Sequence, residues 1–372
     1  KEKSLFVSKL RIDGKASPLM SISTPKPGKS EMQPLGMSTI RDRAKQYLVL
    51  LALDPEWEAK FEPNSYGFRP GRNCYDAVQA IYGHLKLGRN QPNFKKYVLN
   101  ADINGCFDNI NHAYLLEKID TLPEIKLQIK SWLEAGLTED YLRADKYNLI
   151  PANRLGTPQG GIISPFLANV ALHGLETHLK NWIAEKQGPI EYFSTGNRNY
   201  PSKRSKMSSL GVIRYADDFL IIHKDKSLLE DAKTVTECWL KETSGLYLNP
   251  SKTNIICTDN GFTFLGFQFI NVTRNDKKRI KIYPDKSAKK NLIVKVGNIL
   301  RRNRAVSAYD LIQMLRPIIL GWGNYYSICE CSSTFHTVSN DIFGMLRAWV
   351  FRRDRRNNRK HIKEKYFPSN RT

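Results

Sequence analysis

The chain has 372 residues, of which 41% are hydrophobic and 25% charged, a composition that is ordinary for a globular protein of two or three domains. Its 58 Lys and Arg exceed its 36 Asp and Glu and leave a net charge of +22. This excess predicts a polyanionic partner, with nucleic acid as the first candidate. An anionic membrane surface would also suit the charge, but no apolar run reaches the roughly 18 residues of a spanning helix, so we expect no membrane partner.

The six cysteines occur without C-x-x-C spacing, which favours reduced, metal-free thiols. Such thiols are typical of intracellular proteins, and we therefore expect a cytoplasmic location. The chain begins without Met, in a polar segment, and is expected to be a fragment.

The N-terminal part of the chain carries a basic turn, Thr24 to Lys29, between short extended pieces. A helix is predicted from Thr39 to Leu53, where Thr39 caps it and Pro55 ends or bends it. The loop from Asn64 to Arg72 then interleaves rings with guanidinium groups, which suits stacking and backbone contacts on a single-stranded template. An alternative is that the rings fill a core. The side chains concerned are Tyr66, Phe68, Arg69 and Arg72.

The middle of the chain alternates apolar elements with polar loops. An apolar strand from Tyr97 to Asp102 ends just before an Asn-Gly turn. The loop over residues 156–161 has three glycines, which allow a close backbone approach to a ligand, and Gln159, which can hydrogen-bond to it. A long helix from Ser164 to about Ala184 then leads to a flexible insertion near residues 187–209.

The residues from Gly211 to Ile222 predict a β-hairpin, because two apolar runs flank the polar centre Tyr215-Ala216-Asp217-Asp218. Two adjacent carboxylates among apolar residues would repel each other unless a cation neutralised them, and hard divalent ions prefer carboxylate oxygens. Asp102 would come from a separate strand, as a two-metal phosphoryl-transfer site requires. We therefore predict that Asp102, Asp217 and Asp218 are metal ligands. The alternative is a solvated hairpin turn.

The C-terminal part changes from strands to helices. A second hairpin is predicted over residues 251–269, and a small helical bundle over residues 285–353, with its middle helix interrupted by Pro317. From Arg347 to the end, ten Lys or Arg stand against two acids, a density that suggests contacts with phosphate. The arginines expected to bind RNA are Arg352, Arg353, Arg355 and Arg356.

Three motifs occur in a fixed order: Asp102 at a strand end, the loop from Gly156 to Pro165, and the hairpin centre from Tyr215 to Asp218. In this order they resemble the signature boxes of reverse transcriptases. The stretches from Phe61 to Arg72 and from Pro317 to Tyr326 are similar to boxes typical of reverse transcriptases encoded by group II introns, also called maturases. The similarity extends from about Leu10 to the C-terminus.

The resemblance implies an α+β fold of the right-hand polymerase class. Fingers and palm, built from an antiparallel sheet and helices, would occupy residues 1–284, with the flexible insertion near 187–209. An α-helical thumb or maturase bundle would follow over residues 285–353. A basic C-terminal tail would complete the chain over residues 354–372.

The resemblance also implies roles for individual residues. Catalysis would depend on the three aspartates, and two Mg²⁺ ions would be held by Asp102, Ile103, Asp217 and Asp218. Incoming dNTPs would be bound by Lys26, Phe107, Gln159 and Lys252. In this family a ring at the position of Phe107 excludes a ribose 2′-hydroxyl, a form of discrimination by steric clash. Core packing for Phe107, and ordinary surface positions for the two lysines, are the alternatives.

The function implied is that of an RNA-directed DNA polymerase of a group II intron, which also binds the intron RNA to assist splicing and mobility. Its partners would be group II intron RNA, target DNA with its primer, and dNTPs. Its setting would be the bacterial cytoplasm and nucleoid, with an organelle left open. Two alternatives remain, an RNA-binding maturase that acts only as a splicing cofactor and a polymerase of another bacterial retroelement. A monomer and a dimer both remain open.

Overall fold

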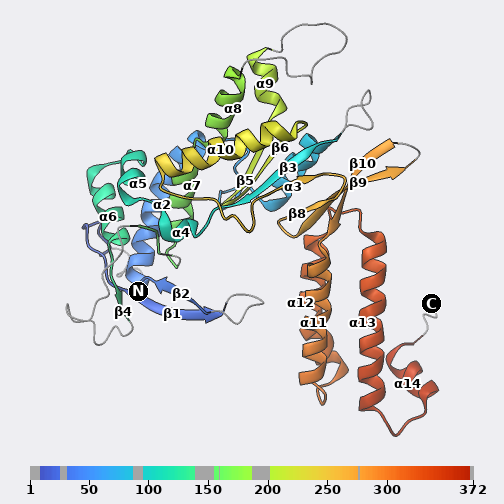
Figure 1. Ribbon diagram of the computed structural model, residues 1–372. Coiled ribbons are helices and arrows are strands. Elements are labelled where there is room, and N and C mark those ends of the chain that lie inside the picture. Colours follow the sequence, from blue (N-terminus) through green and yellow to red (C-terminus); the bar gives the residue numbers. More distant parts are fainter. Residues whose placement is uncertain are drawn as a thin grey trace. The chain divides into compact units, whose positions relative to one another are not determined.

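The computed structural model describes residues 9–25, 32–86, 95–138, 155–158, 160–186, 202–274 and 277–368. These residues form two compact units, of which the first ends at Cys257 and the second begins at Thr258 (Figure 1). Each unit encloses a hydrophobic core of its own. Each is therefore stabilised by the burial of its own apolar side chains.

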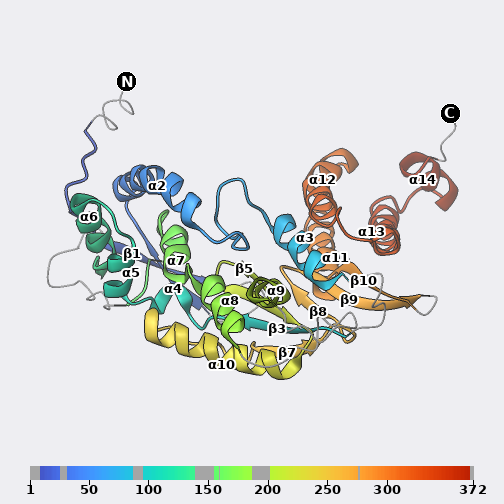
Figure 2. The same cartoon turned by 90° about the horizontal axis from the view of Figure 1, so that it is seen from above.

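A four-stranded antiparallel sheet forms the centre of the first unit. Its strands, in spatial order, are β5 (Gly211–Tyr215), β6 (Asp218–His223), β3 (Tyr97–Asp102) and β7 (Asn254–Cys257). The two inner strands are rich in apolar residues, and Leu99, Phe219 and Ile221 are fully buried. Helix α10 (Lys226–Thr243) packs along the sheet (Figure 2). This core fixes the hairpin β5–β6 that carries Asp217 and Asp218.

A smaller sheet lies in the same unit. Strand β1 (Leu19–Pro25) pairs antiparallel with β2 (Met32–Met37) and parallel with the short β4 (Leu137–Thr138). Thr24 and Pro25 of the predicted basic turn belong to β1, whereas residues 26–31, Lys26 among them, lie outside the described residues.

Eight further helices of the described residues surround these sheets. They are α2 (Ile40–Lys60), α3 (Cys74–Leu85), α4 (Cys106–Asn109), α5 (His112–Lys118), α6 (Pro123–Leu133), α7 (Ser164–Leu172), α8 (Leu175–Glu185) and α9 (Lys203–Ser209).

Four of these helices differ from the expected ones. Helix α2 does not end at Leu53 but continues through Pro55 to Lys60, because Trp57 is buried against Phe61 and Phe166. The single long helix expected from Ser164 is divided into α7 and α8 at Gly174, whose φ is +98°. Helix α9 occupies the end of the expected insertion, where Ser202 caps it, so residues 203–209 are helical and not an irregular loop. Residues 187–201 of that insertion lie outside the described residues.

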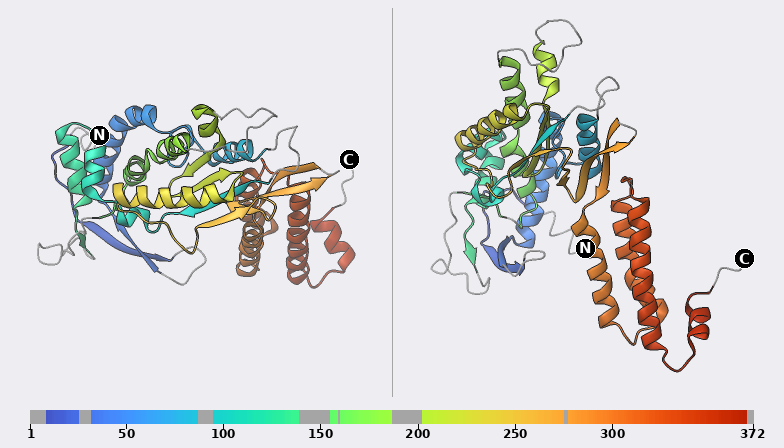
Figure 3. Two further views of the ribbon diagram at one scale, coloured as in Figure 1. Left: turned by 45° about the horizontal axis from the view of Figure 1, so that its top comes forward. Right: turned by 45° about the vertical axis from the view of Figure 1, so that its right-hand side comes forward.

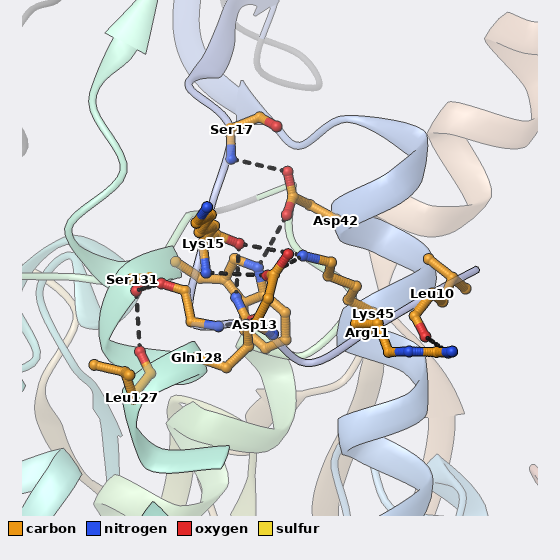
Figure 4. A network of polar contacts seen from close by, with 12 residues as sticks. Leu10, Arg11, Asp13, Lys15, Ser17, Asp42, Lys45, Leu127, Gln128 and Ser131 are labelled. Atoms are coloured by element: carbon orange, nitrogen blue, oxygen red, sulfur yellow. Dashed lines mark hydrogen bonds and ion pairs between the residues drawn. The ribbon is translucent and has the colours of Figure 1, made fainter. Parts of the chain in front are cut away.

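A polar network ties the N-terminal segment to helices α2 and α6 (Figure 4). The Lys45 side chain is 3% exposed, and its ammonium group lies 2.6 Å from Asp13 Oδ1 and donates to the Lys15 carbonyl. The buried amide of Gln128 donates to the same carbonyl at 2.9 Å and accepts from the backbone N–H of Gly14 at 3.0 Å. These paired polar groups fix the path of the chain into β1.

The second unit combines a three-stranded antiparallel sheet with a helical bundle (Figure 3). The strands are β8 (Phe262–Phe264), β9 (Phe267–Arg274) and β10 (Lys277–Pro284), in the order β10-β9-β8. The helices are α11 (Lys286–Arg302), α12 (Ala308–Tyr325), α13 (Ser332–Arg353) and α14 (Arg359–Tyr366). Helix α12 passes through Pro317 without the expected interruption.

Ring contacts join the strands of this unit to α12. The Phe267 ring stacks on Tyr325 with centroids 5.1 Å apart, and the Tyr325 hydroxyl donates to the Leu265 carbonyl. The strands therefore belong to the same compact unit as the helices, which starts at Thr258 and not at residue 285. The functional division at residues 284 and 285, and the separate tail over 354–372, stay predictions. None of the described helices is both long enough and apolar enough to cross a membrane.

Candidate active site

The three predicted catalytic aspartates lie together at one end of the central sheet. In the register of β3 and β6, Asp102 stands directly opposite Asp218. Tyr215 pairs with Asp218 across the hairpin, so Ala216 and Asp217 form the turn. Ala216 has a φ of +58°, a left-handed backbone that lets the hairpin reverse within two residues. The turn thus brings Asp217 beside the facing pair.

Burial makes this carboxylate cluster electrostatically costly. Burial raises the pKa of Asp217, with a further contribution from the charge of Asp102. Burial also raises the pKa of Asp218 to about 7, helped by the charge of Asp217 and by a hydrogen bond with Asp102. Partly buried carboxyls that share a site ionise more readily when a cation compensates their charge.

One cation already contacts the cluster. The Lys252 ammonium group lies 2.8 Å from Asp102 Oδ2, and the Asn249 amide donates to the same oxygen at 3.3 Å. The hydrogen bond to Asp102 raises the pKa of Lys252, whose side chain is 62% exposed. Lys252 therefore lies beside the predicted catalytic carboxylates, and its binding of dNTPs stays a prediction.

A buried arginine forms hydrogen bonds that hold the hairpin turn in place. Arg214 Nη1 donates to Asn169 Oδ1 at 2.9 Å and to the Ala216 carbonyl at 3.2 Å. The Asn169 amide in turn donates to the Gly67 carbonyl at 2.7 Å. Burial lowers the pKa of Arg214 to about 10, still far above neutrality. The sequence pattern did not single out these residues, and its one hint was a charged side chain within an apolar strand.

Gly67 packs directly against the turn. A Cβ atom at this position would lie 2.4 Å from the Ala216 backbone nitrogen, closer than real Cβ contacts come. Ser65 also forms an isolated bridge with Arg214, and the Tyr66 N–H donates to the Arg214 carbonyl. The aromatic loop thus follows the edge of β5 and packs against the hairpin turn.

Within that loop the four predicted template residues divide into two groups. Arg69 is buried: it forms two bonds to Glu58, at 2.6 and 2.8 Å, and donates to the carbonyls of Glu62 and Ser65. The expected template contact of Arg69 is therefore a wrong prediction for this structure, because its donors already organise the loop. Tyr66 is 7% exposed and lies under the guanidinium group of Arg72, so it too packs inside the loop.

Phe68 and Arg72 remain accessible. The Phe68 ring is 57% exposed, and the residue has a φ of +57°, which is unusual for a side chain other than glycine. Arg72 is half-buried, and one of its nitrogens donates to the Pro63 carbonyl. Of the four side chains, that of Phe68 is the most exposed and therefore the most accessible for stacking on a base.

The glycine-rich loop packs against α4, the short helix that carries Phe107. The Gly156 N–H donates to the Ile110 carbonyl at 2.8 Å, and the Thr157 N–H donates to the Phe107 carbonyl at 2.5 Å. A Cβ atom on Gly156 would meet the Asp108 carbonyl oxygen at 2.6 Å, so only glycine fits. Phe107 is half-buried against the core. Gln159, the expected ligand in this loop, lies outside the described residues.

The four predicted RNA-binding arginines of the second unit are exposed at the end of α13 and just beyond it. Arg353 lies over the ring of Trp349, 5.3 Å from its centroid, and donates to the Val306 carbonyl. The others are Arg352, Arg355 and Arg356.

The donor set suits a divalent cation. Asp102, Asp217 and Asp218 offer the oxygen ligands that such ions prefer, and the raised pKa values of Asp217 and Asp218 reflect repulsion that a cation would relieve. Ile103 follows Asp102 and forms a bridge with Leu248, which fixes its backbone at the same place. Among the described residues no three His, Cys, Asp or Glu side chains, these aspartates included, lie close enough together to form a metal site.

Two family models match the chain. The model for reverse transcriptase (RNA-dependent DNA polymerase) matches residues 24–269, well over half of the chain, and the model for the group II intron maturase-specific domain matches residues 289–367.

Curated relatives agree with these matches. The chain is 29% identical over 257 residues to Protein YkfC of Escherichia coli, covering 64% of each sequence. It is 29% identical over 298 residues to the group II intron-encoded protein LtrA of Lactococcus lactis, covering 67% of this chain and 46% of that protein. It is 30% identical over 369 residues to a 91 kDa protein in the cob intron of Schizosaccharomyces pombe, covering 82% of this chain and 43% of that protein. The chain thus spans less than two thirds of the length of these relatives.

Among solved structures, telomerase from Candida albicans aligns with a TM-score of 0.49 and 12% identity, covering 96% of this chain and 63% of that one. The mixed α and β architecture, with antiparallel sheets followed by helices, agrees with the expected fold class. From the family matches, the chain belongs to the reverse transcriptases and carries the maturase-specific domain of group II introns in its C-terminal region.

Proposed function

We propose that the chain is an RNA-directed DNA polymerase of a group II intron, which also binds the intron RNA to assist splicing and mobility. The observation that supports this most is the position of Asp102, Asp217 and Asp218 at one end of the central sheet. A protein that only bound RNA would gain nothing from clustered carboxylates, because they repel phosphate.

Reverse transcriptases generally use divalent metal ions, and we propose that this chain uses two Mg²⁺ ions. They would be held by the three aspartates and the backbone of Ile103. When bound, they lower the pKa of the primer 3′-hydroxyl and neutralise the triphosphate. The carboxylates orient the reacting groups, and the turn held by Arg214 keeps them in place.

Further residues around the site have proposed roles in binding dNTPs. Lys252 carries its ammonium group beside Asp102, where it can neutralise charge on the triphosphate. Phe107 lies on the short helix that follows β3, and its ring would exclude a 2′-hydroxyl. Lys26 and Gln159 keep their predicted roles, since both lie outside the described residues.

The second unit is proposed to bind intron RNA and the duplex of template and primer. The match to a maturase-specific domain and the exposed arginines at the end of α13 support this role. They also support the alternative of a maturase that acts only as a splicing cofactor, but not a polymerase of an unrelated retroelement. The proposed partners are intron RNA, target DNA with its primer, and dNTPs. Oligomeric state and cytoplasmic location stay as predicted from the sequence.

Primer extension on an RNA template with dNTPs and Mg²⁺ tests the proposal. Asp217→Asn keeps the shape of the side chain and removes a ligand charge, so extension should be abolished while RNA binding survives. Asp231→Asn is the matched control, because Asp231 is an exposed acid that pairs with Lys186. Extension by Asp217→Asn at the rate of the control would contradict the proposal. Tight RNA binding without extension by the intact chain would favour the splicing cofactor.

A further inference from the structure

A separate pocket opens at the opposite end of the two inner strands. Tyr97 pairs with His223 there, five residues along from the facing pair of Asp102 and Asp218, which corresponds to about 17 Å along a strand. The pocket has a volume of about 240 Å³. Its polar lining consists of His84, Lys96, Ser208, Ser209, His223 and Lys224. It is therefore distinct from the carboxylate site.

The polar lining consists of cations, imidazoles and hydroxyls. None of the lining residues that the structure describes is Asp or Glu. The two acids whose charges reach the imidazoles are engaged elsewhere. Asp225 accepts from the Ser227 N–H at the start of α10, and Glu176 accepts from the Asn64 amide at 2.7 Å and from Lys180. The Ser208 and Ser209 hydroxyls donate to the carbonyls of Ser205 and Lys206, so the donors that the pocket gathers are its lysines and imidazoles.

The hydrogen bond of one imidazole fixes which nitrogen serves as a donor. The Asp225 N–H donates to His223 Nδ1 at 3.0 Å, so the neutral ring carries its hydrogen on Nε2. That nitrogen lies 3.5 Å from the Ser209 hydroxyl oxygen, on the lining of the pocket. Lys96 is anchored beside it by hydrogen bonds to the carbonyls of His84 and Lys86. The donors therefore have fixed positions, as recognition of an anion requires.

Holding these groups together has an electrostatic cost. Burial lowers the pKa of Lys96 to about 8, with a further contribution from Lys224, and lowers the pKa of His223 to about 4. Burial lowers the pKa of His84 as well, and Lys180 on α8 adds to this effect. A bound anion would offset this repulsion, because opposite charge favours the protonated form of each group.

We propose that this pocket binds a phosphate group, supplied either by an RNA backbone or by free phosphate. The volume exceeds that of a tetrahedral phosphate, which charge-assisted bonds from the lysines and hydrogen bonds from neutral imidazole N–H groups would hold. Binding of phosphate in this pocket is separate from polymerisation. Only the assignment of the phosphate to an RNA backbone rests on the proposed function. Binding of inorganic phosphate is independent of catalysis, so its outcome can be separated from failure of the polymerase.

Calorimetry with inorganic phosphate on the full chain tests the site, in a comparison of Lys224→Glu with Lys226→Glu. Both variants have the same net charge, but Lys226 lies outside the pocket, is exposed and pairs with Glu230. We expect Lys226→Glu to bind as the intact chain does and Lys224→Glu to bind at least about tenfold more weakly. Thermal unfolding checks that both variants fold. If Lys224→Glu does not fold, Lys224→Met and Lys226→Met replace the pair.

A second measurement distinguishes the sources of the phosphate. The affinity for a short single-stranded RNA is measured over a range of salt concentrations. If the pocket holds a backbone phosphate, Lys224→Glu weakens binding more than Lys226→Glu, and its salt slope is smaller by about 0.7. Equal RNA binding together with a difference in calorimetry assigns the pocket to free phosphate. Equal behaviour of the two variants in both measurements overturns the proposal.

Discussion

Asp102 and Asp218 face each other across the neighbouring strands β3 and β6, and the charge of Asp102 contributes to the raised pKa of Asp218. A proton on Asp218 relieves the repulsion between the two carboxyl groups. A divalent cation between them would take the place of that proton. The chain without metal therefore has a built-in electrostatic cost at its proposed catalytic centre.

Mg²⁺ should consequently stabilise the fold. At a Mg²⁺ concentration about a hundredfold above the dissociation constant, we expect a gain of about 2.7 kcal/mol in the free energy of unfolding. Asp218→Asn should remove most of this gain, because it removes both a ligand and the repulsion. Thermal unfolding with Mg²⁺ and with a chelator measures the difference, and Asp231→Asn should behave as the intact chain does. An equal Mg²⁺ effect in Asp218→Asn would place the ion elsewhere.

Gly67→Ala should impair extension although it is far from the aspartates in sequence. The new Cβ atom would lie 2.4 Å from the Ala216 backbone nitrogen, so the catalytic turn must shift. We expect a destabilisation of about 1–3 kcal/mol and a larger relative loss of extension than of RNA binding. Gly344→Ala is the control, because a Cβ atom there meets nothing within 4 Å. Normal extension by a folded Gly67→Ala would show that the turn tolerates displacement.

The sequence predicted the strands and aspartates of the site better than the residues that hold the hairpin turn in place. Asp102, Asp217 and Asp218 could be found because apolar strands lead to each of them, and the period of a strand is readable locally. The contacts of Asn169 with Arg214 and Gly67 join residues far apart in the chain, and no local pattern encodes them. The same limit applies to Arg69. Its partner Glu58 lies on the preceding helix α2, and no local pattern in the sequence indicates their ion pair.

His223 should make stability depend on pH. Burial lowers its pKa to about 4, against about 6.5 in an unfolded chain, so the unfolded chain binds the proton more tightly. The contribution to stability is fully present above about pH 6.5 and is lost as the pH falls toward 4, with a loss on the order of 2 kcal/mol. Urea unfolding in phosphate-free buffer measures this loss.

His223→Gln should flatten that dependence over the same range. The exposed His361 offers the matched control, His361→Gln, which should follow the intact chain. Part of the dependence will persist in His223→Gln, because burial lowers the pKa of His84 and of His173 as well. Identical pH profiles for the two variants would contradict the prediction.

Phe68 is exposed and the adjacent Arg69 is buried, so substitutions at these two positions can distinguish template binding from stability of the fold. Phe68→Ala removes a ring that is 57% exposed, so RNA template affinity should fall by about 1–3 kcal/mol while the fold is retained. Arg69→Ala removes the bonds to Glu58 and to two carbonyls, so the free energy of unfolding should fall by more than about 1.5 kcal/mol. Template binding by fluorescence anisotropy and urea unfolding are measured on both variants. If Arg69→Ala weakened template binding but left the free energy of unfolding unchanged, Arg69 would contact the template directly. A purely structural residue could weaken binding only by destabilising the loop.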